Sequence, residues 1–184
     1  KQIYIMYVGP DIVDDGLVFA VDAGSTRSYA GSGTTVNNLI SSTTATLTNG
    51  TGFSTSNGGL WTFDGTDDYI QVNTTTTPAT GAFTIEFIYQ ISNIGGRGGM
   101  FERNPSSPYN GVTLGQGGAN NWCFSVNNGS QNVTYCATYP TTNTWYHDVG
   151  VYDGVNTVTF YRNGVLLGTT TGSTLGNLDT GGTR

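Results

Sequence analysis

Hydrophobic and polar residues alternate along many short stretches of this chain, which is the pattern of β-strands that bury one face. The clearest stretch is residues 83–91, in which every odd-numbered residue is hydrophobic. Turn-forming residues separate such stretches at roughly 8–12-residue spacing, without helical periodicity between them. The pattern predicts about a dozen antiparallel strands in a two-sheet sandwich. Besides two hairpins, strands are expected at residues 16–22, 45–48, 60–63, 68–72, 83–91, 99–103 and 109–118.

Residues 143–170 predict three consecutive strands joined by two turns. Asn163-Gly164 lies between two runs of β-forming residues and matches a two-residue type I′ turn, because both turn positions need a positive φ. Asp153-Gly154 marks the other connection. Both faces of the second hairpin carry hydrophobic side chains, so we expect it inside a sandwich, where Trp145 and Tyr161 would fill the core. The expected pairs are Arg162 with Val165, Tyr161 with Leu166, Phe160 with Leu167 and Val158 with Thr169.

A second hairpin, centred on Gly129-Ser130, contains the two cysteines of the chain. In its simplest register Cys123 lies opposite Cys136, on the face that also carries Ser125 opposite Thr134. Directly opposed Cβ atoms are close enough for a disulfide, and a bridge would imply an oxidising exterior. Two reduced thiols facing each other are the alternative. The other face pairs Trp122 with Ala137, Phe124 with Tyr135 and Val126 with Val133, while Asn127 faces Asn132.

Charge is scarce in this chain and restricts its partners. Charged residues make up 10% of the sequence, the formal net charge is -6, and Lys1 is the sole lysine. Nucleic acid is therefore not an expected partner, because neutralising phosphates needs clustered Lys and Arg. No hydrophobic run approaches the length of about 20 residues that spans a bilayer, so no membrane partner is expected. The N-terminus carries no signal-peptide pattern, which indicates a processed product or release by lysis.

Five short motifs in the chain are distinctive: FDGTDDYI at residues 63–70, FTIEF at 83–87, TWYH at 144–147, VYDG at 151–154 and YRNG at 161–164. In their order and spacing they resemble the concanavalin A-like, laminin-G-like jelly-roll superfamily. The resemblance implies an all-β, two-sheet antiparallel jelly-roll sandwich over residues 14–184, preceded by an N-terminal arm over residues 1–13. The superfamily normally continues into one or two strands that close the sandwich beside the first strand. The chain is therefore expected to lack a closing C-terminal strand and to leave residues 16–22 with an open sheet edge.

The front of the chain is similar to jelly-roll proteins of tailed-phage virions. The similarity rests on DGLVFAVDA at residues 15–23, Ser28-Tyr29, GSGTT at 31–35 and LTNG at 47–50. It implies a fibre, tail or capsid-surface component whose partners are other virion subunits. We expect the N-terminal arm or the open sheet edge to hold those neighbours, and a homo-oligomer is compatible with a fibre.

A calcium site is a candidate at Asp64, Asp67 and Asp68, which cluster at a strand entrance. Carboxylate oxygens are ligands that Ca²⁺ prefers, and many laminin-G-like domains bind Ca²⁺ at the rim of the sandwich. The alternative is a plain turn, in which Asp accepts hydrogen bonds from its own loop. No other cofactor is expected.

Aromatic side chains near loops are candidates for glycan contact, since their faces can stack on sugars. Trp61, Tyr109 and Tyr139 are the candidates, whereas Trp122 is expected in the core. Glycoside hydrolysis is not expected, because a retaining enzyme needs two carboxyls about 5 Å apart and Glu86 stands without a second acid on its strand face. His147, the only histidine, is expected to be structural.

We therefore expect a non-enzymatic virion structural protein of a tailed phage. Its lectin-like jelly roll would serve surface display, capsid decoration or contact with a host glycan, and the protein would be located in the virion. The alternative is a secreted bacterial carbohydrate-binding module, with or without dependence on calcium.

Overall fold

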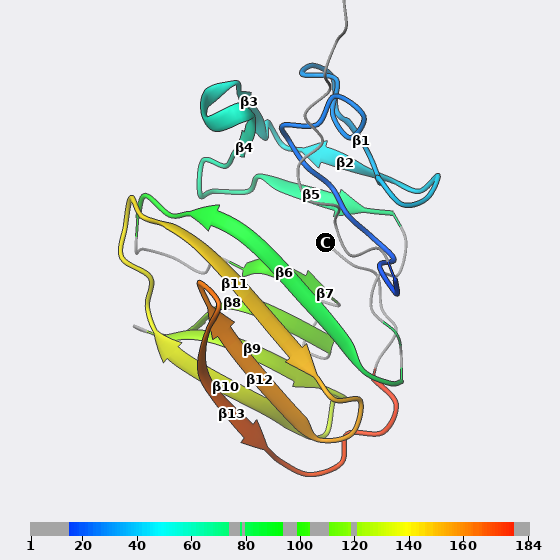
Figure 1. Cartoon of the computed structure of the whole chain (residues 1–184), viewed down its shortest axis with the longest axis vertical. Coiled ribbons are helices and arrows are strands. Elements are labelled where there is room, and N and C mark those ends of the chain that lie inside the picture. The colour runs from blue at the N-terminus through cyan, green and yellow to red at the C-terminus, as the bar shows by residue number, and fades with distance from the viewer. Residues whose placement is uncertain are drawn as a thin grey trace, which may run out of the picture.

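The computed structural model describes residues 15–73, 78, 80–93, 99–103, 111–118 and 121–178, which form thirteen strands and one short 3₁₀ turn, η1 (Ser56–Gly58). Figure 1 shows a lower part built from the later strands and a smaller upper part built from the earlier ones. The strands are β1 (Thr35–Asn37), β2 (Thr44–Thr48), β3 (Gly52–Ser54), β4 (Leu60–Thr62), β5 (Tyr69–Val72), β6 (Phe83–Gln90), β7 (Gly99–Arg103), β8 (Gly111–Gly118), β9 (Asn121–Asn127), β10 (Asn132–Thr138), β11 (Trp145–Tyr152), β12 (Thr157–Arg162) and β13 (Val165–Thr171).

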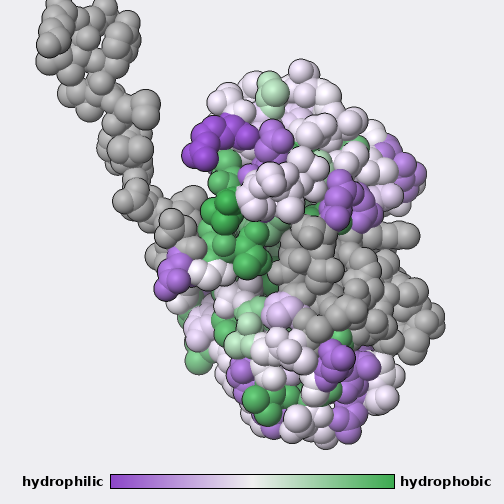
Figure 2. Space-filling model, turned by 90° about the vertical axis from the view of Figure 1, so that its right-hand side faces the viewer, coloured by the Kyte–Doolittle hydropathy of each residue, from purple (hydrophilic) through white to green (hydrophobic). Residues whose placement is uncertain are grey.

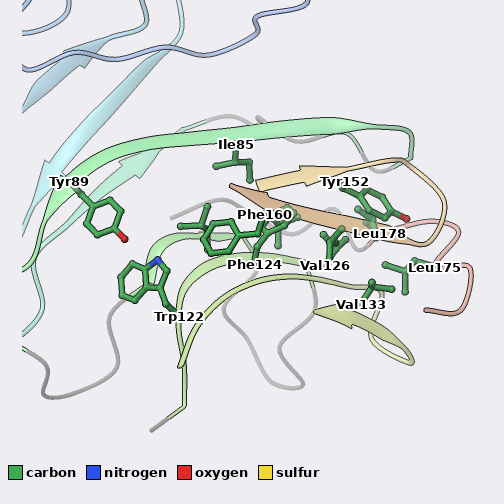
Figure 3. Packing of buried hydrophobic residues seen from close by; sticks show 13 residues of the cluster. Ile85, Tyr89, Trp122, Phe124, Val126, Val133, Tyr152, Phe160, Leu175 and Leu178 are labelled. Atoms are coloured by element: carbon green, nitrogen blue, oxygen red, sulfur yellow. The ribbon is translucent and has the colours of Figure 1, made fainter. Parts of the chain in front are cut away.

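The lower part is a sandwich of two four-stranded antiparallel sheets, ordered β13-β12-β11-β6 and β10-β9-β8-β7. Both inner faces bury their hydrophobic residues in one core, and β10 lies against β12 and β13 of the facing sheet. Figure 3 shows that this core is lined from both sheets. The predicted all-β jelly-roll class is therefore confirmed. The labelled core residues are Ile85, Tyr89, Trp122, Phe124, Val126, Val133, Tyr152, Phe160, Leu175 and Leu178.

Aromatic rings of one sheet fill spaces that glycines leave in the other. A Cβ atom on Gly150 would lie 2.6 Å from the ring of Phe124, and one on Gly168 would lie 2.3 Å from the ring of Tyr135. The Tyr135 hydroxyl also donates a 2.6 Å hydrogen bond to the carbonyl of Leu167. Any side chain at either glycine would push the two sheets apart, so these contacts set the sheet spacing.

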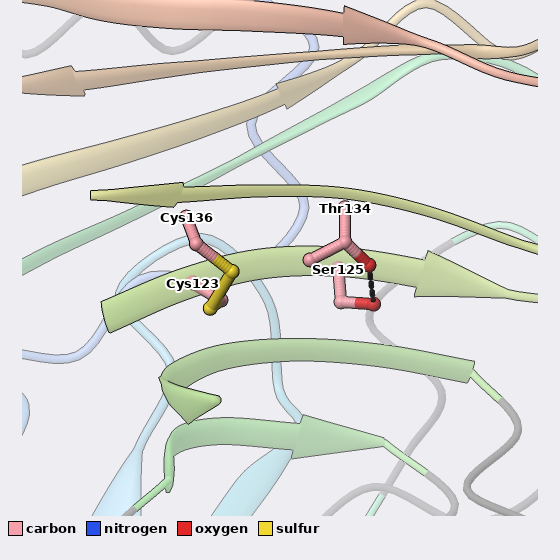
Figure 4. Close-up of a disulfide and its surroundings, with 4 residues drawn as sticks. All are labelled: Cys123, Ser125, Thr134 and Cys136. Carbon is pink, nitrogen blue, oxygen red and sulfur yellow. Dashed lines mark hydrogen bonds between the residues drawn. A yellow bond between two sulfur atoms is a disulfide. The ribbon is translucent and has the colours of Figure 1, made fainter. Parts of the chain in front are cut away.

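The cysteine hairpin has the predicted register at every pair, from Asn132 opposite Asn127 to Ala137 opposite Trp122. The structure joins Cys123 and Cys136 by a disulfide across the ladder, with Cα atoms 4.1 Å apart. Figure 4 shows this bridge on the same face as a 2.7 Å hydrogen bond between the hydroxyls of Ser125 and Thr134. The strands β9 and β10 are thus linked covalently and by polar contacts.

The Asn163-Gly164 hairpin is predicted correctly next to its turn and wrongly beyond it. Both turn residues have positive φ (51° and 76°), and Tyr161 faces Leu166 as expected. A bulge then shifts the register, so Phe160 faces Gly168 instead of Leu167. Val158 consequently pairs with Thr170 and not with Thr169. The physical reason is the Tyr135 ring, which needs the space at Gly168.

The connection at Asp153-Gly154 is held by the aspartate side chain. Its Oδ1 accepts hydrogen bonds from the backbone N–H groups of Val155, Asn156 and Thr157 at 2.8–2.9 Å. Partial burial acts to raise the pKa of Asp153, but these hydrogen bonds favour the carboxylate and the net pKa is lowered. This turn is therefore most stable with Asp153 ionised.

The upper part contains a three-stranded sheet, β1-β2-β5, and the hairpin β3-β4. Its hydrophobic residues form a second cluster, separate from the sandwich core. The predicted strand over residues 16–22 is wrong: this segment belongs to no sheet among the described residues. The Asn38 side chain holds it instead, accepting a hydrogen bond from Ala20 N and donating one to the Val18 carbonyl. The cluster consists of Tyr29, Val36, Ala45, Leu47 and Val72, with Phe19, Val21, Phe53, Trp61 and Ile70 packed against it.

The predicted N-terminal arm, residues 1–13, and the C-terminal residues 179–184, after which a closing strand was expected to be missing, lie outside the described residues. No helix in the described ranges is long and hydrophobic enough to span a membrane. Figure 2 shows a surface of mostly near-neutral hydropathy, with hydrophobic atoms gathered between the upper and lower parts.

Candidate functional site

A pocket of about 260 Å³ opens in the upper part of the molecule. Two glycine-rich loops form it: one precedes β1, and the other runs from β3 through η1. Figure 1 shows these segments side by side at the upper end of the molecule. The lining residues are Ala23, Gly24, Thr26, Tyr29, Ala30, Gly31, Phe53, Thr55 and Gly58.

Two aromatic rings give this pocket its hydrophobic wall. Tyr29 and Phe53 meet edge to face, with ring centroids 5.1 Å apart. The Tyr29 hydroxyl donates a 2.9 Å hydrogen bond to the Gly33 carbonyl, which fixes the ring, and Trp61 packs against its other side at 6.0 Å. The rings are therefore held by the second cluster and need no ligand to order them.

The glycines keep the two loops close together and leave Phe53 partly accessible, while Tyr29 is buried, at 4% exposure. A Cβ on Gly24 would lie 2.7 Å from the Gly58 carbonyl oxygen, and one on Gly59 would lie 2.7 Å from the Gly24 Cα. Gly31 lies over Phe53, where a Cβ would be 3.7 Å from ring atom Cε1. The backbones of the loops thus touch directly, which indicates a pocket formed in advance of binding.

The first loop is tied down by hydrogen bonds that its sequence supplies. Ser28 is fully buried; its hydroxyl donates to the Asn37 carbonyl and accepts from Asp22 N. Asp22 Oδ1 accepts from Gly24 N at 2.8 Å, and Tyr29 N donates to the Ser25 carbonyl. These bonds close a helix-like turn that presents Tyr29 to the pocket.

The chemistry of the lining is neutral. Among its described lining residues none is charged, and Thr26 and Thr55 supply the only side-chain hydroxyls there other than that of Tyr29. Within the described part of the chain these two threonine hydroxyls have no hydrogen-bond partner, so they are available to a ligand. Such a lining can hold an uncharged group with one hydrophobic face, but it offers nothing to a carboxylate or an ammonium.

The structure places two of the predicted glycan-contact residues, Trp61 and Tyr139, against different hydrophobic clusters. Trp61 lies in the second cluster, behind Tyr29, and its buried Nε1 has no hydrogen-bond partner among the described residues. Tyr139 packs against the sandwich core, edge to face with Trp122 at 5.3 Å, and burial raises its pKa. Tyr109 lies outside the described residues.

Trp145 was predicted in the core, and that prediction is wrong. Its side chain is 43% exposed on the outer face of the sheet, near the exposed Ile88. On β11 the inward positions are the even-numbered ones, which include the fully buried Asp148. Tyr161, opposite Val149, lies on the same outer face and does not fill the core. Hydrophobic residues on both faces of β11 concealed its orientation in the sequence.

The three aspartates at the entrance of β5 do come together, with one oxygen from each within 4.8 Å of the others. Two of the carboxylates already take part in turn hydrogen bonds: Asp64 Oδ1 accepts from Thr66 N at 2.7 Å, and Asp68 Oδ2 accepts from Asp64 N at 3.0 Å. Asp68 Oδ1 is buried and has no partner among the described residues. The oxygens of Asp67 and Asp68 that take no part in these turn hydrogen bonds would suit Ca²⁺. The hydrogen bonds that the structure does show at the three aspartates are those of a turn.

Two other acids of the sandwich, Glu86 and Asp148, have structural partners. Glu86 Oε1 lies 3.1 Å from His147 Nε2 on the outer face. Asp148 is fully buried and accepts hydrogen bonds from Arg162 Nε and Nη2, both at 2.9 Å, and from the Tyr89 hydroxyl at 2.8 Å. Burial and the hydrogen bond to Asp148 raise the pKa of Tyr89. Burial opposes the charge of Arg162, but its bonds to Asp148 outweigh this and raise its pKa.

Sequence reasoning missed both the buried Asp148–Arg162 pair and the pocket. For the pair, the only signal was an Asp within a strand otherwise rich in hydrophobic residues. For the pocket, Tyr29 comes from the loop before β1 and Phe53 from the short strand β3, and their neighbours are the Gly, Ser and Thr that mark ordinary turns. The repeated glycines around them were the available signal.

Comparison with known proteins places the chain in one superfamily. Residues 64–183 match the family described as the concanavalin A-like lectin/glucanases superfamily, while no curated protein matches the chain. The binding domain of Paraclostridial Mosquitocidal Protein 1 is 13% identical and superposes with a TM-score of 0.68 over 92% of this chain and 44% of that one. The binding domain of botulinum neurotoxin DC, solved in complex with rat synaptotagmin II, is 14% identical, with a TM-score of 0.59 over 92% of this chain and 43% of that one.

These likenesses show a shared fold, and the chain spans less than half the length of either solved chain. The pocket lies before the matched residues, apart from the region that the superfamily describes. The match itself covers well over half of the sequence, and the two facing sheets fall within it. The chain therefore belongs to the concanavalin A-like lectin/glucanases superfamily.

Proposed function

We propose that this chain is a non-enzymatic recognition domain of a tailed-phage virion that binds neutral glycans on a host surface. The observation that carries the proposal is the pocket between the two loops, with its aromatic wall and uncharged lining. Aromatic faces and hydroxyl groups are the features by which proteins bind uncharged sugars. The net charge of -6 disfavours anionic ligands.

Two further observations support recognition over catalysis. The description of the superfamily names lectins as well as glucanases, and the two solved structures compared above are described as binding domains. Asp148 is fully buried and paired with Arg162, and Glu86 pairs with His147 at the surface. Neither acid is paired with a second carboxyl in the way that glycoside hydrolysis requires.

The virion role rests on the front of the sequence, which resembles virion jelly-roll proteins. In this proposal residues 1–13 attach the domain to a neighbouring subunit. Deleting them is expected to release a folded domain from its particle, as measured by mass spectrometry of purified virions and by circular dichroism of the free domain. Unchanged attachment would refute the role of the arm.

A secreted bacterial carbohydrate-binding module is the second candidate, because the Cys123–Cys136 disulfide fits an oxidising exterior. Mass spectrometry separates the two. The virion proposal predicts the protein in purified particles, whereas the secreted module would be found in the culture medium and be absent from particles.

Glycan recognition is tested with an array of neutral and anionic glycans probed with the intact chain, with and without Ca²⁺. Binding to neutral glycans is expected, and anionic glycans should bind less because the chain is acidic. If no neutral glycan is retained, the recognition proposal fails, while the membership of the superfamily is unaffected.

A further inference from the structure

We propose that the pocket between the two loops binds the acetamido group of an N-acetylated amino sugar. This inference rests on the proposed glycan recognition and names the group that is recognised and the site that holds it. It concerns Tyr29, Phe53 and the loops around them, all of which precede the residues that match the superfamily.

The hydrophobic part of the lining favours a methyl group over hydroxyls. The side chains of Ala23 and Ala30 contribute methyl groups, and Tyr29 and Phe53 contribute rings. An unsubstituted hexose can place its C–H face on a ring, but a hydroxyl inserted among these rings and alanine methyls would lose hydrogen bonds to water. An acetamido group instead presents one methyl, whose burial against rings and alanines is favourable.

The polar part of the lining suits the amide that follows the methyl. Thr26 and Thr55 are exposed, and each hydroxyl can both donate and accept a hydrogen bond. An amide needs one acceptor for its N–H and one donor for its carbonyl, which two hydroxyls from opposite loops can supply. The methyl and the amide of an acetamido group thus match the hydrophobic and the polar residues of the lining.

Charge argues against the other groups that distinguish surface sugars. Sugar carboxylates, sulfates and phosphates would meet no cation in the pocket, since no Lys or Arg is among its described lining residues. A free amino sugar would meet no carboxylate among them either, and the neighbouring Asp22 already accepts a hydrogen bond from Gly24 N. The uncharged acetamido group requires neither partner, so the net charge of -6 does not oppose its binding.

The size of the pocket limits what can enter. A volume of about 260 Å³ is below the usual range of roughly 300–1,000 Å³ for sites that enclose a drug-sized ligand. The contact between the backbones of Gly24 and Gly58 prevents the pocket from extending between the loops. It therefore accepts a substituent and one face of a sugar ring, while the rest of a glycan stays in solvent.

The test compares two sugars that differ by one methyl group, N-acetylglucosamine and N-formylglucosamine, titrated into the intact chain and followed by NMR chemical shifts. The N-acetyl sugar is expected to bind about fourfold more tightly, the effect of burying one methyl. Equal affinities would overturn the inference.

Two variants locate the site. Ala30→Leu enlarges an exposed lining residue and is expected to weaken binding of N-acetylglucosamine at least tenfold while the protein stays folded. Phe53→Ala should weaken it as well, and its matched control is Phe63→Ala, which removes a ring that is 51% exposed and does not line the pocket. Thermal unfolding of each variant checks that the domain is intact.

The outcomes separate this inference from the function on which it rests. If the intact chain binds neutral glycans on the array but Ala30→Leu binds them equally well, the pocket assignment is overturned and glycan recognition stands. If the intact chain binds no neutral glycan, glycan recognition fails and the pocket assignment fails with it.

Discussion

Replacing Arg162 by Met should destabilise the sandwich strongly, because it leaves the fully buried carboxylate of Asp148 without its cation. The Arg162 side chain is 12% exposed and makes two charge-assisted hydrogen bonds to Asp148, while its Nη1 donates to the Thr138 carbonyl at 3.1 Å. These bonds connect β11 and β12 with the end of β10 in the facing sheet. The substitution therefore removes a link between the sheets and leaves the Asp148 carboxylate buried without a cation.

The expected loss follows from the burial of the carboxylate. Removing one partner of a buried ion pair typically costs about 3–5 kcal/mol, whereas the median for an exposed pair is about 0–1 kcal/mol. For a domain of this size, a loss of about 4 kcal/mol corresponds to a fall in Tm of roughly 8–16 °C. Such a loss is a large part of the roughly 5–15 kcal/mol that stabilises a typical domain.

Urea unfolding followed by tryptophan fluorescence measures this loss, since Trp122 is buried beside Tyr89 in the same core. The matched control is the double variant Asp148→Leu, Arg162→Met, which removes both charges and should recover most of the stability. A loss below about 1 kcal/mol for Arg162→Met alone would refute the reasoning, because it would mean that the carboxylate is hydrated.

Three other predictions concern single turns and the covalent link. Reduction of Cys123–Cys136, which are 13 residues apart, should lower the free energy of unfolding by about 3 kcal/mol; an unchanged urea midpoint with reductant would contradict this. Asp64→Ala should cost about 1 kcal/mol and Asp64→Asn almost nothing, with or without Ca²⁺, because the turn needs only the side-chain oxygen. A rise in Tm with Ca²⁺ that Asp67→Asn abolishes would instead support the calcium site. The lowered pKa of Asp153 stabilises the fold at pH values above the unfolded pKa of about 3.9. The native protein should therefore be more stable than Asp153→Asn at neutral pH, and this difference in stability should disappear as the pH falls through the folded pKa; a difference that persists in acid would oppose this.

Local patterns predicted the fold wherever the determining contacts are close in sequence. The register of the cysteine hairpin and the turn at Asn163-Gly164 both follow from adjacent residues. The register beyond that turn does not, because the bulge before Gly168 accommodates Tyr135 from the opposite sheet. Contacts between sheets, such as this one, are not visible in the pattern of a single hairpin.

The sequence also did not show which face of β11 is buried, for a related reason. Its two faces are both rich in hydrophobic residues, so alternation alone does not tell which face is buried. The burial of the Asp148 carboxylate, paired with Arg162, shows that the face of β11 carrying Asp148 is the inner one. Trp145 then points outward, although a tryptophan in a strand is more often expected in a core.

The pocket lay beyond sequence reasoning because it depends on how two loops meet, yet its structure shows which positions can change its ligand. Gly24 and Gly59 are constrained, because a Cβ on either would lie 2.7 Å from backbone atoms of the opposite loop. Thr26, Ala30 and Thr55 line the pocket, are exposed and bear no such constraint. Substitutions at these three positions can therefore alter the ligand while the glycines preserve the pocket, and the sandwich, with its own core, remains unaffected.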